Sequence, residues 1–125
     1  MTTHTNESTD RDSFAPLVFL AYDHAPGSYG LLLSDDHMGS TTALFDQHGH
    51  QGGGYDWEAV ARSAVHARAP EVADRLKYDC EAGMFVAYGS DAEALRKLGA
   101  LLAEAHRDPK VLADYLATAD PDWFD

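Results

Sequence analysis

The chain has 125 residues, 45% of them hydrophobic, and a formal net charge of −12. This size and apolar content fit one ordinary domain and exclude a disordered tail. The excess of acids argues against binding to nucleic acid or to an anionic membrane, since both need clustered Lys and Arg. No apolar run is long enough to cross a bilayer, and the first residues lack the pattern of a signal peptide. We therefore expect a cytoplasmic protein.

The charges are unevenly distributed along the chain. No Lys or Arg lies between Arg11 and Arg62, whereas seven acids and four of the seven histidines do. A segment of this kind favours a basic protein partner, because complementary charge speeds encounter and orients binding. It is equally consistent with an acidic protein that has no such partner.

The first half predicts a polar leader followed by a hairpin. Residues 1–13 are polar and predict a disordered leader, ahead of a single α+β domain at 14–125. Two apolar runs, 17–22 and 29–33, are separated by a turn with Pro and Gly and predict a β-hairpin. The first run is apolar on both faces, so we expect that strand to be central or covered on both sides. A short helix at 41–48 follows, and Gly49 suits its C′ position.

The second half predicts the same order of elements. An apolar stripe at helical spacing predicts a helix at 57–67, with Asp56 as its N-cap. Residues 74–78 alternate charged and apolar side chains, which is typical of an edge strand, and 84–88 completes a second hairpin. The pattern Ser90-x-x-Glu93 predicts a capping box that opens a long helix.

The C-terminal region predicts one more helix and a docked tail. Asp108 and Pro109 are typical of an N-cap and first helical position, and the helix should extend to about residue 118. Trp123 and Phe124 follow it, and we expect both to pack on the body of the protein because exposed they would be a liability. The two halves together suggest a ββαα duplication. It gives an α+β fold with a four-stranded antiparallel sheet, built from two hairpins and packed against four helices.

The segment from His48 to Glu58 combines three consecutive glycines with histidines, aromatics and acids. Glycine permits positive φ and close approach of the backbone, so this segment is either a tightly packed corner of the fold or a recognition site. It lacks the Lys of a phosphate-binding loop and the spacing of a dinucleotide-binding loop.

Asp46, His48 and His50, at and just before this segment, resemble metal ligands in composition, and His24, His37 or Asp35 could complete a set if the fold brought them together. A small metal-binding protein or hydrolytic enzyme is therefore one alternative, and a homodimeric structural or regulatory module is another. No catalytic motif is present. Asp79 and Glu81 flank the single Cys80 and should raise its pKa, unlike that of an activated thiolate. We assign no catalytic residue, metal or cofactor.

The aromatic and acidic residues around the glycines are instead typical of a binding surface for a basic partner. The residues that we expect to contact this partner are Asp35, Asp36, Asp46, His48, His50, Tyr55, Asp56, Trp57 and Glu58.

Four segments of the chain, 14–18, 29–33, 53–58 and 81–87, together form a recognisable pattern. In these segments the chain resembles the immunity protein 51 family of bacterial polymorphic toxin systems. The matching positions are Gly53, Gly54, Tyr55, Trp57, Glu58, Gly83, Met84 and Phe85. The resemblance implies a small cytoplasmic α+β protein, encoded beside a secreted toxin, that binds and neutralises the cognate toxin domain. It also implies no catalysis and no cofactor, and it leaves the activity of the toxin open. Separately, we expect a monomer or weak homodimer.

Overall fold

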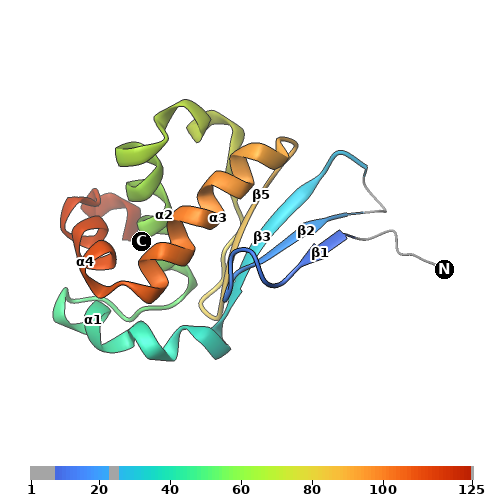
Figure 1. Cartoon of the computed structure of the whole chain (residues 1–125). Coiled ribbons are helices and arrows are strands. Elements are labelled where there is room, and N and C mark those ends of the chain that lie inside the picture. Colours follow the sequence, from blue (N-terminus) through green and yellow to red (C-terminus); the bar gives the residue numbers. More distant parts are fainter. Residues whose placement is uncertain (1–7, 23–25, 125) are drawn as a thin grey trace.

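The computed structural model describes residues 8–22 and 26–124. Within them, an antiparallel sheet in the order β1-β2-β3-β5-β4 has the α-helices to one side (Figure 1). The strands are β1 (Ser8–Asp10), β2 (Val18–Ala21), β3 (Tyr29–Ser34), β4 (Lys77–Tyr78) and β5 (Met84–Gly89). The α-helices are α1 (Thr42–Gln47), α2 (Gly54–Arg68), α3 (Ala92–Arg107) and α4 (Pro109–Thr118). Short 3₁₀ helices are η1 (Asp35–His37), η2 (Gly39–Thr41), η3 (Pro70–Arg75) and η4 (Pro121–Phe124).

Both predicted hairpins form, and they join into one sheet. The β2–β3 and β4–β5 hairpins meet through antiparallel pairing of β3 with β5, with Leu31 opposite Ala87 and Leu33 opposite Phe85. The α+β class and the antiparallel sheet are therefore confirmed. The order β2-β3-α1-α2 followed by β4-β5-α3-α4 is also the order that a ββαα repeat predicts.

The sheet has five strands, so the prediction of four was wrong. The additional strand, β1, comes from the polar segment that the sequence analysis assigned to a disordered leader, and it pairs with the outer side of β2. This strand of Ser, Thr and Asp has no apolar alternation in the sequence, since its backbone pairing with β2 does not require apolar side chains. Residues 1–7 of the expected leader lie outside the described residues.

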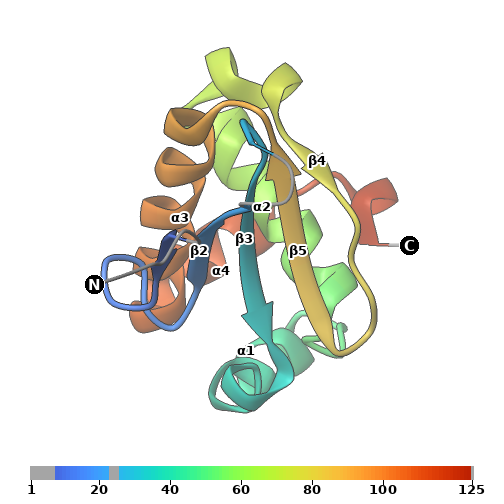
Figure 2. The same ribbon diagram turned by 90° about the vertical axis from the view of Figure 1, so that its right-hand side faces the viewer.

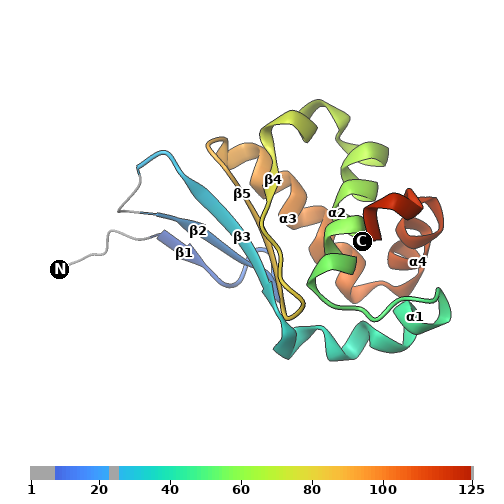
Figure 3. The ribbon, with the colours of Figure 1, turned by 180° about the vertical axis from the view of Figure 1, so that it is seen from behind.

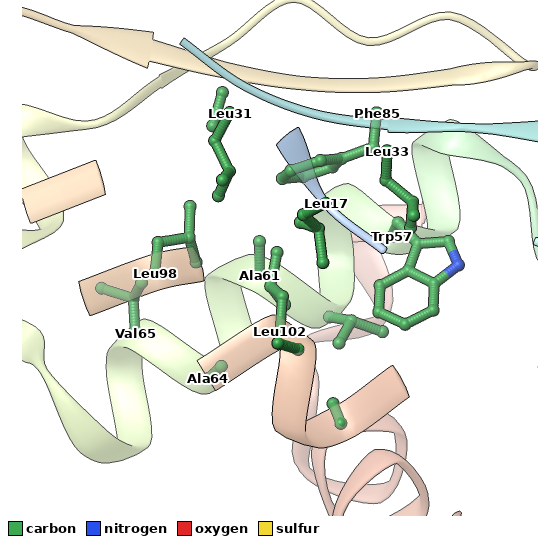
Figure 4. Close-up of a cluster of buried hydrophobic side chains, with 14 of the residues drawn as sticks. Leu17, Leu31, Leu33, Trp57, Ala61, Ala64, Val65, Phe85, Leu98 and Leu102 are labelled. Carbon is green, nitrogen blue, oxygen red and sulfur yellow. The ribbon is translucent and has the colours of Figure 1, made fainter. Parts of the chain in front are cut away.

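The hydrophobic core lies between the sheet and the α2–α3 layer. Side chains of β3 and β5 alternate, so that Leu31, Leu33 and Phe85 are fully buried and point toward α2 and α3 (Figure 4). The two helices cross this face of the sheet, as the turned view also shows (Figure 2). Leu98 and Leu102 of α3 contribute the facing side of the core.

The opposite face of the sheet has no covering helix among the described residues (Figure 3). Val18 and Leu20 of β2 and Leu32 of β3 lie there and are only partly buried. The expectation that the first apolar strand is interior holds, because β2 lies between β1 and β3, but helices cover only one of its faces. No helix in the described part of the chain is both long and apolar enough to span a membrane.

Two helix starts differ from the prediction. Helix α2 begins at Gly54 with Gly53 as N-cap, three residues before the predicted start, so Asp56 is inside the first turn and is not the N-cap. Helix α3 is capped by Asp91, whose side chain accepts hydrogen bonds from the backbone N–H groups of Glu93 and Ala94, so the predicted capping box at Ser90 was wrong. Asp is as favourable an N-cap as Ser, so the local sequence permits either residue. The packing of α3 on the core selects Asp91 over Ser90.

The remaining predicted elements are close to those observed. Helix α1 ends before Gly49, which has φ +82°, and helix α4 has the predicted Asp108 cap and Pro109 start. Strand β4 lies at the edge of the sheet but is shorter than expected, because η3 extends to Arg75. The C-terminal η4 packs against α2, so the tail docks on the body as predicted.

The Asp91 cap gives a first testable prediction. We expect Asp91→Ala to lower the midpoint of urea unfolding at pH 7, because it removes two cap hydrogen bonds and the ion pair with Arg75. Ser90→Ala, one residue outside the cap, is the matched control and should leave the midpoint unchanged. A larger loss of stability in Ser90→Ala than in Asp91→Ala would instead support a capping box that begins at Ser90.

The same cap predicts a pH dependence. The hydrogen bond from the Ala94 backbone N–H, with smaller contributions from Arg75 and Glu93, holds the pKa of the Asp91 carboxyl below its ordinary value. Because the pKa is lower in the folded state, the stabilisation is complete above the unfolded pKa of about 4 and is lost as the pH falls through the folded pKa. The difference in midpoint between wild type and Asp91→Ala should therefore shrink below about pH 4.

Candidate functional site

The glycine-rich segment forms a tight corner between α1 and α2, which we call the glycine corner (residues 49–57). Gly49 and Gly52 have φ of +82° and +87°, a conformation in which side chains other than glycine are strained. The backbone N–H of Gly49 donates to the Asp46 carbonyl at 3.0 Å and that of His50 to the Phe45 carbonyl at 2.9 Å. The corner thus closes α1 and reverses the chain toward α2.

Gly53 and Gly54 lie directly against the turn between β4 and β5. The backbone N–H of Gly54 donates to the Ala82 carbonyl at 2.8 Å. A Cβ on Gly53 would be 2.6 Å from the Ala82 carbonyl oxygen, and one on Gly54 would overlap the carbonyl oxygens of Glu81 and Met84. Only glycine fits both positions, so the structural interpretation of this segment is correct.

Asp56 anchors the corner from inside α2. Its carboxylate Oδ2 accepts a hydrogen bond from the Gly52 backbone N–H at 2.6 Å, and the residue is only 8% exposed. Its place in the first turn of α2 also puts the negative charge where the helix dipole stabilises it. The Asp56 side chain therefore has a structural role, but it fulfils this role from inside the first turn of α2 and not as the predicted N-cap.

Trp57 is the centre of the core next to the corner. It is fully buried, packs against Phe45 with ring centroids 5.5 Å apart, and lies beneath Leu33 (Figure 4). Trp57 has no exposed surface, so its contact with a partner stays a prediction that this fold does not favour. The physical reason is the early start of α2, which turns Trp57 inward and the adjacent Tyr55 outward.

The exposed part of the corner surrounds a pocket of about 300 Å³. Tyr55 is 48% exposed, and His50 stacks on Phe124 of η4 with ring centroids 3.7 Å apart and planes 8° apart. The lining residues are Gly49, His50, Gln51, Gly53, Tyr55, Asp56, Ala82 and Phe124. Docking of Phe124 is expected from the sequence, but its place in this pocket depends on the path of η4 along α2, for which the sequence has no local signal.

The exposed carboxylates near the corner come from three other segments. Asp35 and Asp36 lie in η1, and a Cβ on Gly83 of the β4–β5 turn would be 3.5 Å from Asp35 Oδ2. Asp46, at the end of α1, and Glu81, in the β4–β5 turn, are also exposed. We call these four residues the acidic end, since η1, α1 and the β4–β5 turn lie at the same end of the molecule (Figure 2).

The other two predicted contact residues differ in position. Glu58 lies on α2, apart from this group, and its carboxylate binds Arg62 at 2.8 Å. His48 is exposed at the end of α1, two residues after Asp46. The structure therefore brings Tyr55, Asp56 and His50 together at the pocket, with Asp35, Asp36 and Asp46 around the same end.

The residues considered as metal ligands are dispersed. His50 is stacked on Phe124, and the carbonyl of His37 is 2.7 Å from His106 Nε2. His24 lies outside the described residues. Among the residues that are described, no group of three or more His, Cys, Asp or Glu has the geometry to hold a metal ion.

Cys80 is packed against β5. Its Sγ accepts the backbone N–H of Val86 at 3.3 Å. Burial raises the pKa of the thiol to about 12, and Glu58 and Asp79 act in the same direction. The expectation of a raised pKa is correct, although burial and not the neighbouring acids is the largest cause.

Gly54 gives a test of the corner. Alanine is favoured over glycine inside a helix by about 1 kcal/mol, but here its Cβ would overlap two backbone carbonyls, which cannot rotate away as a flexible side chain could. We expect Gly54→Ala to destabilise by about 2–4 kcal/mol in urea unfolding. Gly39→Ala, where nothing lies within 4 Å of the new Cβ, is the control and should be neutral or slightly stabilising. Equal effects at both positions would contradict the close packing.

Cys80 gives a second test. With a thiol pKa of about 12, very little thiolate exists at pH 8, so reaction with a disulfide reagent should be slow. We expect a rate at least about 100-fold below that of the same protein in urea, rising with pH. A native rate close to the unfolded rate would show that the thiol is accessible and activated.

Comparison with known proteins agrees with this architecture. A family model described as immunity protein 51 matches residues 17–121. No curated protein and no solved structure matches the chain. The matched span contains both hairpins, the glycine corner and helices α1 to α4, so the resemblance found in the sequence is confirmed. Since the match covers most of the chain, this protein belongs to the immunity protein 51 family.

Proposed function

We propose that this protein binds a toxin domain in the cytoplasm and neutralises it by occupying its surface, without catalysis and without a cofactor. The observation that carries the proposal is membership of the immunity protein 51 family, which suggests a toxin-neutralising role. The cognate toxin domain is proposed to be basic and to meet the acidic end of the molecule. The glycine corner supplies a rigid platform for that contact.

Charge supports this choice of surface. Asp35, Asp36 and Asp46 are exposed, and none of them takes part in an ion pair among the described residues. Carboxylates that are not neutralised within the protein attract a basic partner over a distance of about a Debye length, which is about 8–10 Å at moderate salt. Such attraction mainly raises the association rate and orients the partner.

Packing also supports the glycine corner as part of the contact surface. A binding surface keeps its shape at low entropic cost when rigid elements hold it, and the β4–β5 turn and α2 fix each other through the Gly54 contact. Tyr55 projects from this rigid corner with 48% of its surface exposed. Tyrosines in such positions are frequent hot spots of protein interfaces.

The experiment is binding to the toxin domain encoded beside this gene. We expect Asp35→Asn/Asp36→Asn to reduce the association rate about ten-fold at low salt, with a difference that narrows as salt is added. The control, Asp74→Asn/Glu93→Gln, makes the same change of net charge at exposed positions of η3 and α3 and should have a smaller effect.

Two outcomes would contradict the proposal. Failure to bind the neighbouring toxin domain, or to protect cells that express it, would remove the neutralising role. Equal effects of the two double variants would show that net charge matters and that the acidic end is not the contact surface.

A further inference from the structure

The pocket at the glycine corner contains a carboxylate that the protein itself leaves partly unsatisfied. Asp56 is more than nine-tenths buried and lines the pocket. Its Oδ2 accepts one hydrogen bond, from the Gly52 N–H, and no hydrogen bond or ion pair among the described residues reaches Oδ1. A carboxylate can accept about four hydrogen bonds, so this one has capacity for a donor that enters the pocket.

The charge of this carboxylate is not balanced by a neighbouring cation. The three ion pairs among the described residues are Arg62–Glu58, Arg75–Asp91 and Lys97–Glu71, and none involves Asp56. No Lys or Arg lines the pocket. The N-terminus of α2 contributes about half a positive charge, which offsets the carboxylate only in part. Among the residues that line the pocket, Asp56 is the only carboxylate, and His50 is the only side chain that can carry a positive charge.

Aromatic surfaces form the walls beside this charge. Tyr55 is exposed at the rim, and the stacked pair of His50 and Phe124 forms another wall. The faces of Tyr and Phe rings attract cations through their quadrupoles. A carboxylate beside aromatic faces suits a planar cation better than a neutral group or an anion.

We propose that this pocket binds the guanidinium group of one arginine side chain of the partner. Guanidinium is planar, donates several N–H groups toward a carboxylate, stacks on aromatic rings and is less strongly hydrated than an ammonium group, so arginine is preferred to lysine. A pocket of about 300 Å³ is at the small end of ligand sites, which suits one side chain. The identity of the partner as a toxin domain rests on the proposed function, whereas the chemistry of the pocket does not.

The first experiment uses small probes and needs no toxin. N-acetyl-arginine amide should produce saturable chemical-shift changes at the backbone amides of Gly52, Gly53 and Tyr55. The citrulline analogue, which has the same shape without the charge, is the matched control and should not. The lysine analogue should bind more weakly than the arginine analogue. No saturable change with arginine, or equal changes with citrulline, would overturn the inference.

Variants assign the effect to the pocket. Asp56→Asn keeps an acceptor for the Gly52 N–H but removes the charge, and we expect it to weaken binding of the arginine probe about ten-fold or more. Phe124→Leu removes the stacked wall without touching the corner backbone and should also weaken binding. Asp74→Asn, in η3 outside the pocket, should leave it unchanged. If Asp56→Asn fails to fold, Phe124→Leu decides, and unchanged binding in that variant would overturn the inference.

The same variants separate this inference from the proposed function. In a double-mutant cycle with the toxin domain, one toxin Arg→Ala substitution should weaken binding to wild type but add little to Asp56→Asn. Toxin binding without any arginine coupled to Asp56 would reject the pocket and leave the neutralising role intact. Binding of the arginine probe without binding of the toxin domain would support the pocket and reject the neutralising role.

Discussion

The contact between the backbone of Gly53–Gly54 and the β4–β5 turn is the constraint on which the rest of this structure depends. The Gly54 N–H donates to the Ala82 carbonyl, and carbonyl oxygens of the turn occupy the space where a side chain would be. This contact sets the first residue of α2. Every side chain of α2 then has a fixed direction, because the helix has 3.6 residues per turn.

From this start, three adjacent residues receive three different environments. Tyr55 points to solvent, Asp56 turns back to hold Gly52, and Trp57 enters the core between α1 and the sheet. One turn of helix thus links the surface, the pocket and the core. The backbone that carries Tyr55 is thereby held by the core, because moving it would require moving Trp57.

The second organising feature is the separation of charge along the chain. The basic-free segment folds into β2, β3, η1, α1 and the start of α2, and its exposed acids at η1 and α1 meet the β4–β5 turn at one end of the molecule. The later half supplies the cations, and the ion pairs formed by Arg62, Arg75 and Lys97 lie elsewhere. Among the described residues, Asp35, Asp36 and Asp46 of this segment form no ion pair, whereas Glu58 is paired with Arg62. Carboxylates without an internal partner can attract a basic protein over a long range.

The sequence by itself determined the class of fold, the two hairpins, the four α-helices and the family, because apolar periodicity, turn residues and short motifs are local signals. It also identified the glycine segment as unusual, since three glycines have a recognisable entropic cost. Only the tertiary structure decided that Trp57 is buried while Tyr55 is exposed, that Asp91 and not Ser90 caps α3, and that β1 completes the sheet. It likewise brought Phe124 onto His50, 74 positions away in the chain. These outcomes depend on long-range backbone contacts and on packing. Neither can be recognised from the residues that are adjacent in the sequence.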